Sequence, residues 1–247
     1  MLLLAAVVFI NKENLGLGST YGFTSVNAAF IGDSGKIYCI DNGREAICII
    51  DEEKNVSRVL RGGSSSRGFF YAEGIAEGSD NTLYILDESY TGDSSSDSLS
   101  GYRILTYKNP GYTVIFDSGS QKIYDLQYYK DSLYFLQEEE FGLGLYQLKP
   151  GNEAVLRKRI YAGDILNDAS VDLSTDLIAI ATKRGAVRIQ KSAFSTWFTL
   201  KNEKGHIMPR TVTARNGYVY FSELYSGSIC GFNEISVENY RESYREK

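Results

Sequence analysis

The feature that most constrains this chain is an apolar run that recurs at intervals of 42 to 50 residues. Each copy is rich in residues that favour β-strands, and four of the five have Tyr at the second position. A Gly and another apolar run follow each copy, which is the pattern of a β-hairpin. The five copies are Ile37–Asp41, Leu83–Asp87, Leu133–Gln137, Leu177–Ala181 and Val219–Glu223.

This interval is typical of the four-stranded blades of β-propellers, which repeat roughly every 40 to 50 residues. The sequence therefore predicts an all-β fold, a β-propeller of five or six four-stranded blades. The fifth unit is incomplete unless residues 235–247 add a strand rather than an exit helix, or the N-terminal run supplies one. The propeller is expected to span residues 20–247, after an apolar N-terminal segment and linker at residues 1–19.

The expected strands keep the same order in each unit, and the five copies above are the second strands. The first strands are expected at Val26–Ile31, Ala72–Glu77, Asp125–Tyr129, Ala169–Leu173 and Thr211–Arg215. The third strands are expected at Ala46–Ile50, Tyr102–Tyr107, Leu143–Leu148, Ala186–Gln190 and Ser228–Phe232. The fourth strands are expected at Val56–Leu60, Thr113–Phe116, Ala154–Ile160 and Thr196–Leu200.

The first hairpin turns at Asn42-Gly43, a dipeptide that favours a two-residue type I′ turn. With that turn, Cys39 pairs with Ala46 and Ile37 pairs with Cys48. The two thiols are then diagonal to one another, and a disulfide between them is geometrically awkward. Together with the odd count of three cysteines, this arrangement favours buried free thiols.

Composition excludes two classes of protein. Hydrophobic residues make up 43% of the 247 residues and there are only 3 Pro, so a chain that is mainly disordered is excluded. The net charge is -5 and the basic residues are scattered, so nucleic acid is not an expected partner.

The N-terminal run Met1–Ile10 is wholly apolar and ends at Asn11-Lys12-Glu13. It is shorter than the roughly 20 residues of a spanning helix. Three interpretations remain open: the end of a membrane anchor that begins outside this chain, a buried strand that completes the propeller, or a signal-peptide core. The last interpretation lacks a basic leader and a clear cleavage site.

Candidate ligand-binding residues lie at the starts of the expected first strands, which line the mouth of the central channel in a propeller. The sequence places Asn27, Glu73, Asp125, Asp168 and Arg210 there. Such a ring suits a small polar or cationic ligand, although channel mouths are polar in any propeller. A buried carboxylate pair there would have a perturbed pKa, which is a marker of function.

Other candidates are weaker. His206, the only histidine, precedes the last first strand and is an accessory candidate near Arg210. One His and no thiolate cluster argue against a zinc site, so no cofactor is expected, with a divalent ion as the alternative. Acidic residues are expected in the loops between second and third strands, as a solvated rim with calcium binding as the alternative: Asp87-Glu88, Asp93, Asp97 and Glu138–Glu140.

The blade pattern resembles that of NHL- and YVTN-type bacterial β-propellers. It is carried by Glu73–Ala76 with Asn81–Asp87 and Tyr102–Ile104 in one unit, and by Gly35–Asp41 in another. An apolar N-terminal run before a propeller also resembles the outward-facing sensor regions of Firmicute membrane signalling proteins, some of which carry a diguanylate cyclase output domain. That context is an analogy, because fold does not determine function.

The resemblance implies an extracytoplasmic sensory module at the cell membrane that binds a small polar ligand or a protein partner, with membrane contact through Met1–Ile10. Because the sequence carries no catalytic signature, an enzyme is the alternative: a metal-dependent propeller lyase or lactonase using Glu73, Asp125 and Asp168. A further alternative is a protein-interaction scaffold that binds along its loops. The sequence does not determine the ligand, the number of blades or the oligomeric state.

Overall fold

The computed structural model describes residues 26–32, 34–51, 56–62, 68–90, 99–108, 111–161, 166–191, 198–200, 208–223 and 229–233. Met1–Ile10, the predicted boundary at residues 19–20, Asp93, Asp97 and His206 lie outside these ranges. The described residues form nineteen β-strands and one short 3-10 helix. None of their helices has the length and hydropathy that a membrane span requires.

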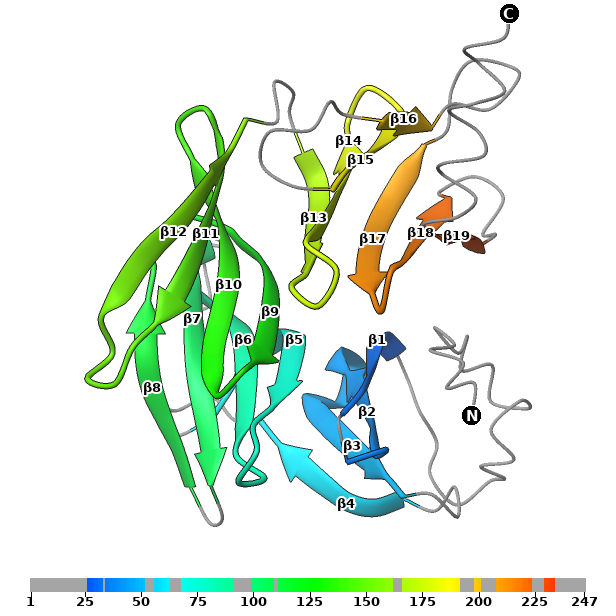
Figure 1. Ribbon diagram of the computed structural model, residues 1–247. Helices are drawn as coiled ribbons and strands as arrows, with labels where there is room; N and C mark the ends of the chain where they lie inside the picture. Colours follow the sequence, from blue (N-terminus) through cyan, green and yellow to red (C-terminus); the bar gives the residue numbers. More distant parts are fainter. Residues whose placement is uncertain are drawn as a thin grey trace, which may run out of the picture. The chain divides into compact units, whose positions relative to one another are not determined.

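The strands form five antiparallel sheets in which each strand pairs with the next along the chain (Figure 1). Four sheets have four strands, and the sheet of β17, β18 and β19 has three in the described part of the chain. The first two sheets contain β1 Val26–Ile31, β2 Ile37–Asp41, β3 Ala46–Ile50 and β4 Val56–Arg61, then β5 Tyr71–Glu77, β6 Leu83–Tyr90, β7 Leu99–Lys108 and β8 Gly111–Asp117.

The remaining three sheets continue the same order along the chain. They contain β9 Ile123–Tyr129, β10 Ser132–Glu139, β11 Gly142–Leu148 and β12 Ala154–Ile160; β13 Leu166–Asp172, β14 Leu177–Thr182, β15 Ala186–Lys191 and β16 Phe198–Leu200; and β17 Pro209–Arg215, β18 Tyr218–Glu223 and β19 Ile229–Asn233. The structure thus confirms the predicted all-β fold and the order of strands in every unit.

The chain divides into two compact units. One comprises Met1–Leu133 with Leu148–Ala154, and the other comprises Tyr134–Gln147 with Val155–Lys247. In the first unit, the sheets β1–β4 and β5–β8 share a core to which Ile40, Ile47, Ile85 and Leu105 contribute fully buried side chains. Burial of each such side chain stabilises the fold by roughly 1.5 to 3 kcal/mol, so facing apolar strand surfaces hold the two sheets together.

In the second unit, apolar side chains of β14 and β15 pack with those of β17 and β18. Ala179, Ala181 and Val187 lie opposite Val212 and Phe221 in this core, and all five are buried. The fourth unit, which has Ile178 in place of the recurrent Tyr, thus contributes small apolar side chains to this core.

Polar side chains of β13 also hold the first strands of the last two sheets together. The Asp168 carboxylate accepts the Val212 amide at 2.8 Å, and Ser170 Oγ accepts the Ala214 amide at 3.0 Å. Asp172 Oδ2 accepts the Gly217 amide at 2.7 Å. These three residues share one face of β13 because side chains alternate along a strand, and they satisfy amides of β17 and the turn that follows it.

The first hairpin differs from its predicted form. The Asn42-Gly43 dipeptide lies in a 3-10 turn that spans Asn42–Arg44, and Glu45 takes the left-handed conformation with φ of 49°. Asp41 therefore pairs with Ala46, and Cys39 pairs directly with Cys48. The predicted diagonal placement of the thiols was wrong, because the turn contains four residues between the paired strand ends rather than two.

Both thiols are free and fully buried, as predicted. Burial, with a smaller contribution from Cys48, raises the pKa of Cys39 to about 12. We expect a thiol reagent to leave both cysteines of a Cys230→Ser variant unmodified in the native state and to label both in guanidinium chloride, because only the thiolate reacts. Rapid labelling before unfolding, measured by mass spectrometry, would contradict the buried register.

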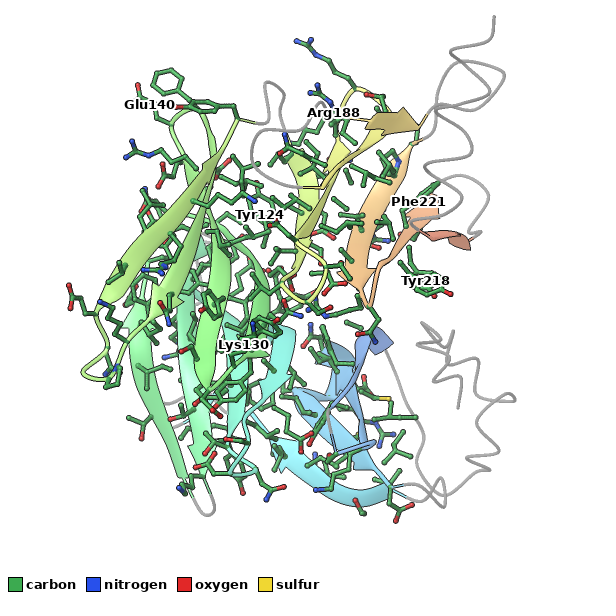
Figure 2. The ribbon with its side chains drawn as sticks, viewed as in Figure 1. Tyr124, Lys130, Glu140, Arg188, Tyr218 and Phe221 are labelled. Carbon is green, nitrogen blue, oxygen red and sulfur yellow. The ribbon has the colours of Figure 1, made fainter. Side chains whose placement is uncertain are left out.

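The acidic stretches also differ from prediction. Asp87 and Glu88 lie within β6, and Glu139 is the last residue of β10, so these carboxylates belong to strands and not to loops. Glu140 lies at the exposed tip of the β10–β11 hairpin (Figure 2). Only this last part of the predicted acidic rim is a solvated loop in the described residues.

Candidate functional site

A β-bulge recurs near the start of the first strand of four sheets. In each case one residue of the first strand is skipped in the pairing with the second strand. A bulge re-aims the extra side chain away from the regular alternation of the strand. The extra residues are Asn27, Glu73, Asn167 and Arg210.

Three of these four residues are sequence-predicted site residues. The fourth is not, because the bulge of the β13–β14 pair is at Asn167, one residue before the predicted Asp168. Asp168 and Asp125 share a different feature: each accepts the amide of the following residue, at 2.9 Å for Ala169 and 2.8 Å for Leu126. Asp125 thus corresponds to Asp168. The residue before it, Tyr124, corresponds to Asn167, which is the bulge residue of the β13–β14 pair.

The second sheet holds a pair of carboxyl groups at its bulge. Glu73 is the extra residue of β5, between Ala72, which pairs with Asp87, and Gly74, which pairs with Leu86. Glu88 follows Asp87 on β6, and its charge and a side-chain hydrogen bond both contribute to raising the pKa of Glu73. Both side chains are partly exposed, and a bound molecule therefore has access to them.

Tyr102 supports the pair from the adjacent strand β7, where it pairs with Glu88. Its hydroxyl donates a hydrogen bond to Glu88 Oε1 at 3.2 Å, and only 5% of the residue is exposed. Gly101 allows this placement: a Cβ there would lie 2.3 Å from the Gly119 carbonyl oxygen, which accepts the Tyr102 amide. The close backbone contact fixes the start of β7 beneath the carboxyl pair.

The surroundings of Glu73 favour the protonated form of its carboxyl group. Burial and the neighbouring Glu88 charge raise the pKa of Glu73 to about 7, against an opposing effect of Lys122. The Lys122 ammonium lies over the Tyr124 ring, 4.8 Å from its centroid. A carboxyl group with a pKa raised in this way is a marker of a functional site.

The other predicted site residues differ from Glu73 in burial and hydrogen bonding. Asp125 is buried, and the Asp168 carboxylate accepts backbone amides with both of its oxygens. The Arg210 side chain is exposed. Glu73 and Asp125 belong to one compact unit, and Asp168 and Arg210 belong to the other. The backbone of Asn27 is described but its side chain is not.

Among the described candidate residues, only the carboxyl groups of Glu73 and Glu88 suit a metal ion. Among the residues that the structure describes, no group of three or more His, Cys, Asp or Glu side chains is placed to hold a metal. Glu73 and Glu88 offer two oxygen ligands of the kind that Ca²⁺ or Mg²⁺ prefers. A metal-binding role for Asp168 conflicts with the two amides that its oxygens accept.

Sequence reasoning missed Glu88, Tyr102 and Asn167 as members of these sites. The signal for Glu88 was present, because it directly follows the recurrent Asp87 at the end of the second-strand motif. The assignment of Glu88 to a loop hid its pairing with Tyr102. The position of the bulge required the register between β13 and β14, which hydrophobic spacing does not provide.

No protein-family model matches this sequence, and no curated protein matches it. Solved structures match its fold. A gluconolactonase from Xanthomonas campestris has a TM-score of 0.58 and 15% identity, covering 80% of this chain and 69% of that one. A chain of a nidogen–laminin complex has a TM-score of 0.57 and 14% identity, covering 84% and 75%. A virginiamycin B lyase from Staphylococcus aureus has a TM-score of 0.51 and 10% identity, covering 84% and 69%.

At these identities the likeness shows the fold alone, and it places this all-β chain in the β-propeller class. The predicted resemblance to bacterial propellers is supported at that level. The narrower resemblance to Firmicute sensor regions has no support in these comparisons. Two of the three proteins are named as enzymes and the third is part of an assembly, so the candidate site has to be argued from its own chemistry.

Proposed function

We propose that this chain is a propeller enzyme that opens a lactone or a similar ester, with Glu73 and Glu88 as its acid–base group. The observation that carries the proposal is the partly exposed carboxyl pair at the β5 bulge, held by Tyr102. The likeness to a gluconolactonase supports the same class of reaction. The proposal includes five or six blades, in keeping with the five sheets of Figure 1.

With a pKa near neutrality, the Glu73 carboxyl group can both accept and donate a proton during lactone hydrolysis. In its deprotonated state Glu73 accepts a proton from a water molecule as the water oxygen attacks the lactone carbonyl. The carbon–oxygen bond of the ring then breaks, and the pair returns that proton to the departing alkoxide, giving a hydroxy acid. A bound divalent ion on the same carboxylates would polarise the carbonyl.

The test is proton release from a panel of aldonolactones, beginning with glucono-δ-lactone, measured with and without divalent cations. We expect Glu73→Gln to lower kcat/KM by roughly 100-fold or more, the usual contribution of general acid–base catalysis. Wild-type activity should rise with pH through about 7, where Glu73 loses its proton. Glu140→Gln, at the exposed hairpin tip, is the matched control and should keep full activity.

Glu73→Gln should also be more stable than the wild type above pH 7, because ionised Glu73 and Glu88 repel one another in the folded state. A thermal melt therefore separates lost catalysis from lost folding. The proposal fails if no lactone is hydrolysed faster than in buffer, with or without metal, or if Glu73→Gln retains the wild-type rate.

A second proposal, favoured by the apolar run Met1–Ile10, is a sensory module outside the membrane that binds a small polar ligand or a protein. The exposed Arg210 side chain, at the bulge of β17, is a group that an anionic part of such a ligand could contact. Thermal-shift measurements with sugars, amino acids and peptidoglycan fragments test it. A shift lost in Arg210→Ala, without turnover, would favour the sensor over the enzyme. Partner binding that survives substitution of the bulge residues would favour a scaffold.

A further inference from the structure

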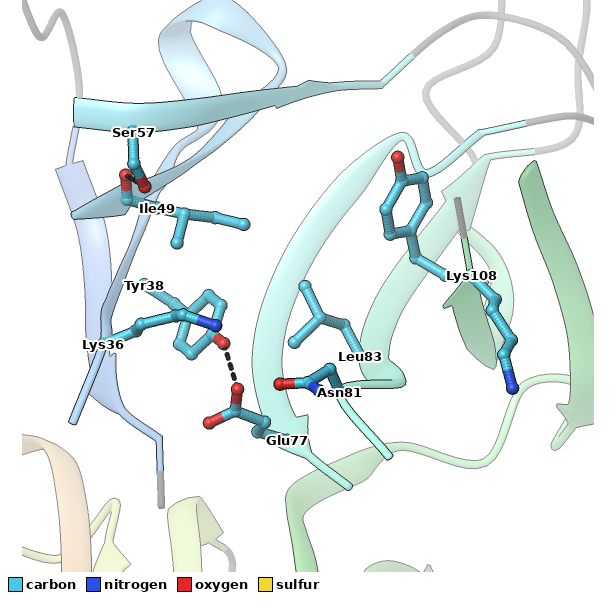
Figure 3. A pocket seen from close by; sticks show the side chains of 9 residues that line it. Lys36, Tyr38, Ile49, Ser57, Glu77, Asn81, Leu83 and Lys108 are labelled. Carbon is cyan, nitrogen blue, oxygen red and sulfur yellow. Dashed lines mark hydrogen bonds between the residues drawn. The ribbon is translucent and has the colours of Figure 1, made fainter. Parts of the chain in front are cut away.

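A recess lies in the first compact unit, at the opposite end of β5 from Glu73. It is a cavity of about 470 Å³ between the sheets β1–β4 and β5–β8. That volume is in the range of small-molecule sites. Figure 3 shows Lys36, Tyr38 and Glu77 on one side of the cavity, with Leu83 and Asn81 facing them.

The inner surface of this cavity is apolar. Ile49 and Leu83 belong to the core shared by the two sheets, as does the ring of Tyr107. Ser57, which is exposed, lies at the outer part and donates to the Ile49 carbonyl at 3.1 Å. A ligand bound beside Ser57 therefore contacts apolar side chains.

The charged groups around the cavity are not equivalent. The Glu77 carboxylate accepts the Tyr38 hydroxyl at 2.7 Å and the Ser34 hydroxyl at 2.7 Å, which leaves it satisfied within the protein. Lys108 pairs with Asp80 at 3.1 Å. Lys36 is partly exposed, and no carboxylate lies within 4 Å of its ammonium among the described residues. The charge of Lys36 helps to lower the pKa of Glu77, but without a direct ion pair the Lys36 ammonium is accessible to an anionic ligand.

We propose that this cavity binds a small carboxylic acid with an apolar body, such as a medium-chain fatty acid. The carboxylate pairs with Lys36, and the hydrocarbon chain covers Ile49, Leu83 and the Tyr107 ring. Such a ligand neutralises Lys36 and removes apolar surface from water in one step. The lining carries two ammonium groups, those of Lys36 and Lys108, against the single carboxylate of Glu77, and this balance favours an anionic over a cationic ligand.

The test uses the fluorescence of 1-anilinonaphthalene-8-sulfonate bound to the full chain, with octanoate as the competitor. We expect saturable displacement by octanoate, with an affinity about fivefold lower in Lys36→Gln because one partly exposed charge-assisted contact is lost. Ser57→Phe should abolish displacement, since the larger side chain occupies part of the cavity that Ser57 lines. Lys130→Gln, which changes an exposed lysine in the β9–β10 turn, should bind octanoate as the wild type does.

Octan-1-ol separates the contribution of charge from that of hydrophobicity, because it should bind the wild type and Lys36→Gln equally. Near-ultraviolet circular dichroism checks that each variant is natively folded. Displacement that is unaltered in both Lys36→Gln and Ser57→Phe would overturn the proposal, as would the absence of saturable displacement from the wild type.

Discussion

Replacing Asp87 with alanine is expected to lower the free energy of unfolding by about 3 to 5 kcal/mol, the cost of leaving a buried charge without its partner. Asp87 is fully buried and pairs with Arg103, whose side chain is 12% exposed, at 2.7 Å. Its other oxygen accepts the amides of Phe70 and Tyr71 at 2.7 and 2.8 Å. The substitution therefore leaves the Arg103 guanidinium without its carboxylate and two amides without an acceptor at the start of β5.

Urea unfolding followed by circular dichroism measures this effect. Asp80→Asn is the matched control, because the Asp80–Lys108 pair is mostly exposed and such pairs contribute little. Removing the partner charge as well, in Asp87→Ala with Arg103→Met, should recover part of the loss. If Asp87→Ala unfolds at the same urea concentration as Asp80→Asn, the buried pair does not hold β5 as described.

Asp87 also shows how far sequence reasoning extends. The recurrence of Leu83–Asp87 in other units correctly predicted a second strand in each sheet, because spacing and alternation are local properties of the chain. The motif did not reveal that Asp87 binds Arg103 and fixes the preceding connection. That role depends on which residue of β7 faces it, and a one-residue change in register would move Arg103 to the other face.

The candidate site was only partly predictable for the same reason. Glu73 was identified because it begins a first strand, but its partner Glu88 is fifteen residues later in the sequence and was assigned to a loop. The two carboxyl groups meet because a bulge displaces Glu73 from the regular pairing of β5 with β6. Bulges have no reliable sequence signal here, since their residues are as different as Glu73, Asn167 and Arg210.

The second large effect is expected at Asp172, where substitution by asparagine should lower the free energy of unfolding by about 3 kcal/mol at neutral pH. Asp172 is 1% exposed, and its carboxylate accepts hydrogen bonds from Ser174, the Thr175 hydroxyl and the Gly217 amide. An asparagine amide nitrogen would face one of these donors, because only one side-chain oxygen remains. The contact with Gly217 joins β13 to the β17–β18 turn, so the loss affects two sheets.

The effect of Asp172→Asn should depend on pH. Burial opposes ionisation of Asp172, but the hydrogen bonds from Ser174, Gly217 and Thr175 outweigh it and lower the pKa of the carboxyl below its usual range. A carboxylate with a lowered pKa stabilises the fold above its unfolded pKa of about 3.9, and this contribution is lost as the pH falls through the folded value. The difference in stability between wild type and Asp172→Asn should therefore shrink below about pH 4.

Urea titrations at neutral and acidic pH measure this difference. Asp176→Asn is the control, because Asp176 is exposed, has a φ of 52° that asparagine accepts, and lies only four residues away. A loss in Asp172→Asn that is constant with pH would mean that packing, rather than the ionised carboxylate, joins the last two sheets. If the loss disappears in acid, the buried hydrogen bonds that ionised Asp172 accepts stabilise the last two sheets.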